Sequence, residues 1–200
     1  MSIVKLNNRG VKHATAFGSI TGLGNLIFIS RSTASSSSSV SITSGIDSTY
    51  KEYIFVFNNI HASTQAHFQV NFSADGGSNY NVTKTTSFFF SSHNEAGDSV
   101  SFSYQGSYDL AQSTSAQPLG LSFSSDSDAG GAGYMHLFDP SNTTFVKHFI
   151  SVACGFTDSD YYNTNYAAGY GNTTSAINAV QFSMASGNID SGTIDMYGVS

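Results

Sequence analysis

The chain has 200 residues, of which only 10% are charged and 40% are hydrophobic, and its formal net charge is −6. This length suits one domain with a buried core. A composition poor in Lys and Glu but rich in Ser, Thr, Phe and Tyr argues against coiled coils and favours an all-β protein. Seven basic residues against 13 acidic ones argue against a nucleic-acid-binding surface. We find no apolar stretch long enough for a membrane span and no signal peptide. The single cysteine, Cys154, allows no internal disulfide.

The first 39 residues differ from the rest in charge. Residues 1–39 contain four of the seven basic residues, and the first acidic residue is Asp47. The Ser-rich segment 32–39 is typical of a flexible linker. We therefore predict an N-terminal arm and linker over 1–39 and a folded domain over 40–200. The arm is either a disordered terminus or a segment that docks on a partner. The candidate docking residues are Lys5, Arg9, Lys12, Phe17 and Arg31.

From residue 40 onward, short apolar runs alternate with polar turns. Residues 50–60 have apolar side chains on both faces, which is typical of a central strand. Phe68, Val70 and Phe72 alternate with polar residues, as in a half-buried strand. Further strands are expected over residues 40–42, 80–90, 100–104, 119–123, 134–138, 145–152, 180–184 and 193–197. About ten strands without helical periodicity predict a single β-sandwich, jelly-roll-like, with an extended N-terminal arm.

One segment near the C-terminus has the composition of a binding surface. It contains Tyr161, Tyr162, Tyr166 and Tyr170, with asparagines between them. Such loops bind adaptably, because tyrosine offers a large contact area at a low entropic cost. We interpret these tyrosines as a loop binding surface. The alternative left open is that they cap the ends of the sandwich or fill a subunit interface.

The sequence offers few residues for catalysis or metal binding. The six histidines lack the close spacing of a zinc site. Segments 126–128 and 158–160 carry aspartates suited to calcium but lack the rest of a calcium loop. Glu52 adjoins Lys51, which favours an exposed ion pair over the paired acids of a glycoside hydrolase. Cys154 ends a strand, which favours a small buried side chain over a nucleophile. We therefore expect no enzyme activity, no cofactor and no metal.

Three segments together carry a resemblance to known proteins. They are SGIDS followed by YKEYIFVFNNIH (44–61), HLFDP leading into FVKHFIS (136–151), and SGTIDMYG (191–198). With them, residues 40–200 resemble small all-β proteins of tailed phages that infect marine bacteria and cyanobacteria. The resemblance implies a virion structural protein, and it carries over no catalytic residues.

Three classes of function remain after these observations. We expect a capsid decoration or cement protein, made in the host cytoplasm, that binds the major capsid protein or another virion protein at the capsid surface. A basic arm on an acidic body suits docking on an acidic patch of the capsid. The first alternative is a tail-fibre or head-fibre adhesin whose sandwich loops bind host glycan, and the second is a carbohydrate-active enzyme. A chain of 200 residues without a repeat leaves no room for a fibre shaft, which favours decoration. A homo-oligomer, for instance a trimer, suits decoration and fibre alike, and no nucleic-acid or membrane partner is expected.

Overall fold

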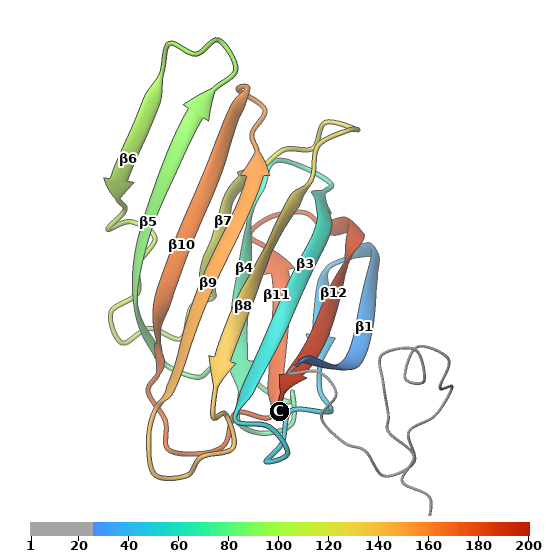
Figure 1. Cartoon of the computed structure of the whole chain (residues 1–200), viewed down its shortest axis with the longest axis vertical. Coiled ribbons are helices and arrows are strands. Elements are labelled where there is room, and N and C mark those ends of the chain that lie inside the picture. Colours follow the sequence, from blue (N-terminus) through green and yellow to red (C-terminus); the bar gives the residue numbers. More distant parts are fainter. Residues whose placement is uncertain (1–25) are drawn as a thin grey trace, which may run out of the picture.

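A computed structural model describes residues 26–200, which form twelve β-strands and no helix. The strands are β1 (Leu26–Ser37), β2 (Ser39–Ile42), β3 (Glu52–Ala62), β4 (Ala66–Ser73), β5 (Lys84–Asn94), β6 (Val100–Tyr104), β7 (Gln117–Phe123), β8 (Gly131–Phe138), β9 (Lys147–Phe156), β10 (Tyr161–Gly171), β11 (Ala179–Met184) and β12 (Ile189–Val199). They build two antiparallel sheets that pack face to face (Figure 1), which confirms the predicted β-sandwich.

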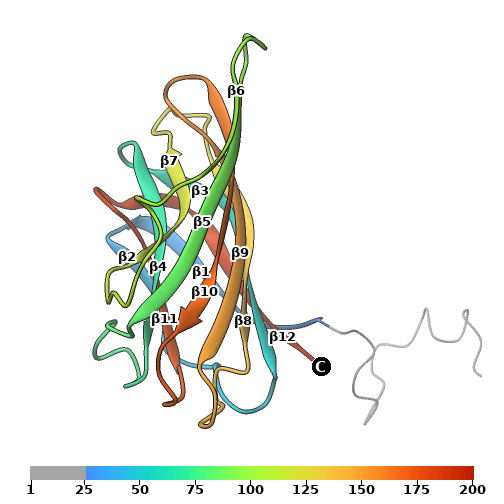
Figure 2. The same ribbon diagram turned by 90° about the vertical axis from the view of Figure 1, so that its left-hand side faces the viewer.

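Eight of the strands have the order of a jelly roll. One sheet contains β1-β12-β3-β8 and the other consists of β2-β11-β4-β7, which is the arrangement produced by two Greek keys. Two hairpins are inserted into this plan: β5–β6 between β4 and β7, and β9–β10 between β8 and β11. Strand β10 pairs with β5 and β9 pairs with β8, so the insertions extend the first sheet to eight strands. Figure 2 shows the smaller sheet on one side of this large sheet only.

The core between the sheets is aromatic. Tyr53, Phe55 and Phe57 of β3 are buried at alternate positions, as the sequence pattern predicts. The Phe57 ring lies 5.1 Å from that of Phe68 and 5.2 Å from that of Phe182, so the two sheets meet through ring-to-ring contacts. Such pairs stabilise a core beyond the area that they bury.

The buried ring of Phe123 depends on three glycines. A Cβ atom would lie 2.4 Å from this ring at Gly120, 2.0 Å at Gly131 and 2.6 Å at Gly155. These glycines belong to β7, β8 and β9. The missing side chains therefore leave the space in which the ring of Phe123 packs between the sheets.

Two buried lysines flank the end of strand β10 at one end of the sandwich. Lys84 and Lys147 are the first residues of β5 and β9, and both lie opposite Gly171 of β10. Both are fully buried. The Lys84 ammonium donates to the carbonyl of Val82 at 2.9 Å, and that of Lys147 donates to the carbonyl of Phe145 at 2.8 Å. Burial lowers the pKa of both lysines, to about 8 for Lys84.

The prediction of a flexible linker over 32–39 is wrong. Strand β1 pairs with β12 from residue 26 to residue 37, so the large sheet includes this part of the segment assigned to the arm and linker. Ala34 is the only fully buried side chain of β1, which explains why this edge strand lacks an apolar alternation in its sequence. Arg31 lies in the same strand and donates to both carboxylate oxygens of Asp195 at 2.7 Å. The other predicted docking residues, Lys5, Arg9, Lys12 and Phe17, lie outside the described residues.

Candidate functional site

The four tyrosines of the predicted binding loop lie in strand β10, so the prediction of a loop is wrong. This strand runs in the middle of the large sheet, between β9 and β5. Tyr162, Tyr166 and Tyr170 lie four residues apart on the outer face of the sheet, and the Tyr166 ring stacks on Phe89 with centroids 4.8 Å apart. The hydroxyl of Tyr161 bonds instead to Ser99 at 3.1 Å. Three of the four tyrosines therefore share one surface.

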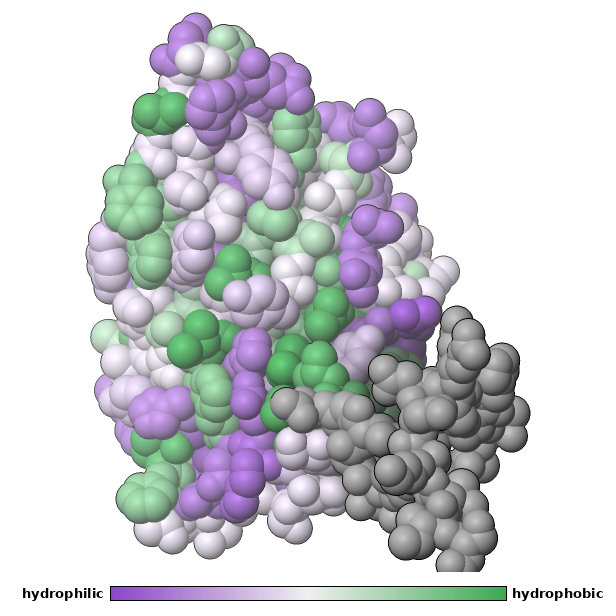
Figure 3. Space-filling model, viewed as in Figure 1, coloured by the Kyte–Doolittle hydropathy of each residue, from purple (hydrophilic) through white to green (hydrophobic). Residues whose placement is uncertain are grey.

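The outer face of the eight-stranded sheet, which we refer to as the open face, has no second layer among residues 26–200. The smaller sheet packs on the opposite side (Figure 2). Figure 3 shows the open face, with hydrophobic residues gathered across its middle. Its exposed aromatic and aliphatic residues include Phe28, Val100, Phe102, Tyr104, Tyr134, Ile150 and Tyr162. Large apolar patches are rare on monomeric soluble proteins, which makes the open face the candidate interaction surface.

The acidic groups on the open face are paired. Glu52 of β3 bonds to the ring of His136 on the neighbouring strand β8. The expected ion pair of Glu52 with Lys51 is therefore wrong, because Lys51 pairs with Asp139 at 3.1 Å. The guanidinium of Arg31 holds the pKa of the Asp195 carboxyl below its usual value, through hydrogen bonds and charge.

In the described part of the chain, every Lys and Arg side chain bonds to a partner within the chain. The pairs are Arg31 with Asp195, Lys51 with Asp139, Lys84 with the carbonyl of Val82, and Lys147 with the carbonyl of Phe145. All 13 acidic residues also lie in residues 26–200. This body therefore suits neutral or basic partners, whereas the three basic residues of segment 1–25 suit an acidic one.

Two neighbouring hollows form a groove on the open face, which we refer to as the aromatic groove. One measures about 520 Å³ and is lined by Phe138, Phe145 and His148, together with the polar side chain of Asn142. The other measures about 450 Å³ and is lined by Phe138, His148 and Tyr170. Because the two hollows share Phe138 and His148, they are continuous across β8, β9 and β10. The sequence pattern did not reveal this groove, since its walls come from three strands.

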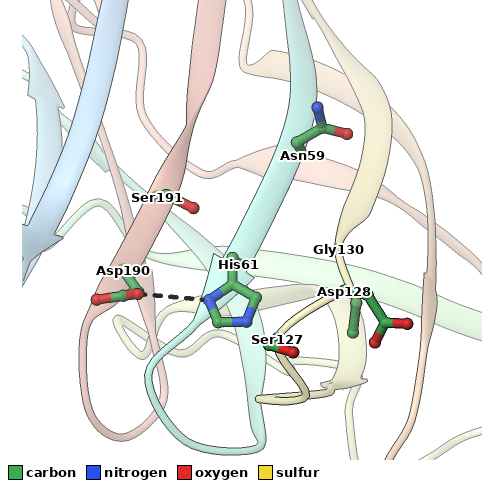
Figure 4. A pocket seen from close by; sticks show the side chains of 8 residues that line it. Asn59, His61, Ser127, Asp128, Gly130, Asp190 and Ser191 are labelled. Carbon is green, nitrogen blue, oxygen red and sulfur yellow. Dashed lines mark ion pairs between the residues drawn. The ribbon is translucent and has the colours of Figure 1, made fainter.

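A separate polar hollow of about 630 Å³ lies where β3 ends, β12 begins and the β7–β8 connection passes (Figure 4). Nδ1 of His61 is 3.6 Å from the Asp190 carboxylate, and Nε2 is 3.1 Å from the backbone carbonyl of Asp126. Ser127 and Asp128 line the opposite side. His61 thus ties the ends of two strands to the connection. Within residues 26–200, no three His, Cys, Asp or Glu side chains converge as a metal site would require.

The single thiol lies on the open face. Cys154 is half-buried rather than fully buried, and its contact with Tyr162 raises the pKa of that phenol to about 12.

No helix that could cross a membrane occurs in the described part of the chain. Comparison with known proteins gives no match, whether to a family model, to a curated protein or to a solved structure.

Proposed function

We propose that the protein is a virion structural protein of a tailed phage, and that it decorates the capsid by binding the major capsid protein lattice. The observation that carries this proposal is the open face, an apolar surface whose acidic groups are paired. It extends from β1 to β6. Covering such a surface with a partner is favourable, because apolar area leaves water.

The class of partner comes from the resemblance of residues 40–200 to small all-β phage proteins. The jelly-roll order of the strands agrees with this class, since viral capsid and lectin domains use this architecture often. A fold by itself assigns no function. The proposal therefore depends on the exposed surface and on where the chain is found, both of which are open to experiment.

Segment 1–25 supplies a second docking element in this proposal. It carries Lys5, Arg9, Lys12 and Phe17, and it contains no acidic residue. An acidic patch on the capsid attracts this segment and repels the acidic body, which orients the protein as it binds. Arg31 is no longer among the proposed docking residues, because it forms an ion pair with Asp195.

Copy number in purified particles tests the proposal first. Quantitative mass spectrometry against the major capsid protein should give a simple fraction of the lattice, and absence from the particle would overturn the proposal. A second test uses particles that lack the protein, to which purified variants are added. Ile150→Asp places a charge in the middle of the open face and should abolish binding. Ser41→Asp, on the outer face of the smaller sheet, is the matched control and should bind like wild type.

The aromatic groove favours a second candidate function, that of a fibre adhesin that binds host glycan. Phe138 and Tyr170 offer apolar ring surfaces for a sugar ring, and Asn142 offers a polar group in the same groove. Host lipopolysaccharide oligosaccharide, titrated by calorimetry, is the probe. Tyr170→Ala should weaken binding, whereas Tyr162→Ala, on the same strand outside the groove, should not. A handful of copies per particle together with glycan binding would favour this candidate over decoration.

A further inference from the structure

Strand β6 forms a free edge of the eight-stranded sheet, at the end of an inserted hairpin (Figures 1 and 2). Its residues alternate between serine and large apolar side chains. Val100, Phe102 and Tyr104 are exposed by 72, 73 and 60%, and among residues 26–200 only Phe145 is an equally exposed large hydrophobic residue. The Phe102 ring contacts that of Phe89, with centroids 5.7 Å apart, so the apolar surface of β6 continues into the open face.

The other three sheet edges carry features that oppose pairing with another chain. Strand β1 has a bulge between Phe28 and Ser30 and carries Arg31. Strand β2 has only four residues. Strand β7 contains Pro118, which lacks a backbone donor, and its register shifts twice against β4. Strand β6 has no charge, no proline and no bulge. Among these four edges, it is the one without a feature that opposes pairing with another chain.

Hydrogen bonds to β5 fix which backbone groups of β6 are free. The backbone N–H of Gln105 donates to Phe88 at 2.9 Å, and the carbonyl of Ser99 accepts from Asn94 at 3.1 Å. In an antiparallel ladder the bonding direction alternates along the strand. The odd-numbered residues of β6 therefore bond to β5, and the N–H and C=O groups of its even-numbered residues face the free edge.

We propose that β6 pairs with β6 of a second copy of the chain, antiparallel and centred on Phe102. In this register Val100 lies opposite Tyr104 and serine lies opposite serine, so the strand is complementary to itself. Each even-numbered residue exchanges both of its hydrogen bonds with the second strand. The two-fold pairing joins two large sheets into one and gives a dimer in place of the trimer considered from the sequence. The inference goes beyond the proposed function, because it holds whichever partner the open face binds.

Disulfide trapping tests the register directly, in the full chain with Cys154→Ser as background. Directly opposite residues of a hydrogen-bonded pair have Cα atoms about 5.5 Å apart, a separation that a disulfide can span. Phe102→Cys should therefore form a covalent dimer under mild oxidation. Val100→Cys should not, because the two copies of position 100 lie roughly 13 Å apart along the paired strands. The double variant Val100→Cys/Tyr104→Cys should cross-link again. Equal trapping of all three variants, or of none, overturns the proposal.

Sedimentation of the untagged chain at micromolar concentration supplies the second test. Wild type should be a dimer. Phe102→Pro removes an N–H that faces only the free edge and should raise the dimer dissociation constant at least ~10-fold. Phe145→Ala, at an equally exposed phenylalanine outside β6, should leave the dimer intact. A monomeric wild type overturns the inference, and so does a folded Phe102→Pro variant that dimerises as wild type does. If that variant fails to fold, the cysteine series decides.

Discussion

The buried ammonium of Lys84 makes the stability of this protein depend on pH in a direction that the structure fixes. Its Nζ atom bonds to the carbonyl of Val82 and to the side chain of Asn71, with no carboxylate among these partners. Burial lowers the pKa of Lys84 from 10.5 to about 8. Between these two values the unfolded chain still holds a proton that the folded chain has released. Raising the pH through this interval therefore stabilises the folded state.

The size of the effect follows from the difference in pKa. Each pKa unit corresponds to about 1.4 kcal/mol, so the full difference amounts to about 3 kcal/mol. Between about pH 7.5 and 9.5, the free energy of unfolding should rise by about 2 kcal/mol from Lys84 alone. We limit the interval to about pH 9.5 because Tyr53 and Tyr162 have raised pKa values in the folded protein. At higher pH these two tyrosines make the free energy of unfolding fall as the pH rises. Lys147 adds to the rise with the same sign, because its pKa is also lowered.

Urea denaturation at several pH values measures this dependence in wild type, in Lys84→Met and in Lys51→Met. The Lys84→Met chain should lose most of the rise, whereas Lys51→Met, at an exposed side chain, should keep it. Parallel pH profiles for wild type and Lys84→Met would refute the reasoning, because they would show that Lys84 titrates in the folded protein as it does in the unfolded chain.

Two further substitutions test the packing and the ion pair that shape the large sheet. Gly131→Ala places a Cβ 2.0 Å from the ring of Phe123, and we expect the free energy of unfolding to fall by about 2 kcal/mol. Phe123→Leu in the same chain should recover part of that loss, which a double-mutant cycle in urea measures. Arg31→Met removes the group that lowers the pKa of Asp195. The wild type should exceed this variant in stability near neutral pH, and an acid titration should show the difference shrinking as the pH falls through the folded-state pKa of Asp195.

Strands with an apolar residue at every second position on the inner face are the part of the fold that the sequence predicts well. In β3 and β4 the residues expected on the inner face, such as Phe55 and Phe68, are fully buried. The alternation is visible because the smaller sheet covers this face and selects apolar side chains there. The jelly-roll order of the strands agrees with the expectation too, since many short strands with turns between them leave few other architectures.

The sequence did not predict strands β1 and β10, because they form through hydrogen bonding to neighbouring strands and show no apolar periodicity. Strand β1 forms by hydrogen bonding to β12, more than 150 residues later, and buries only Ala34. In β10 the inner positions hold Asn163 and Asn165, and the Asn165 amide donates to the carbonyl of Ala153 at 3.2 Å. A strand with amides inside and aromatic rings outside has the composition of a loop. Only the partner strands on both sides reveal it.

The candidate site escaped prediction for a related reason. Phe138, His148 and Tyr170 are separated by 10 and 22 residues, and the groove exists because the register of β8, β9 and β10 brings them together. Register depends on which strands become neighbours. The insertion of β9–β10 into the jelly-roll plan determines which strands are neighbours here, and no local feature of the sequence predicts this insertion.

Two of the inserted strands, β6 and β10, have a polarity opposite to that of the core strands. In β3 the rings point inward, to a core that the smaller sheet closes. In β6 and β10 the serines and asparagines point inward, and the rings of residues such as Phe102 and Tyr166 point outward. Aromatic side chains on a solvated face favour aggregation and contribute nothing to the core. They become favourable only when another surface covers them. The proposed partner surface therefore depends on β6 and β10 more than on the jelly-roll core.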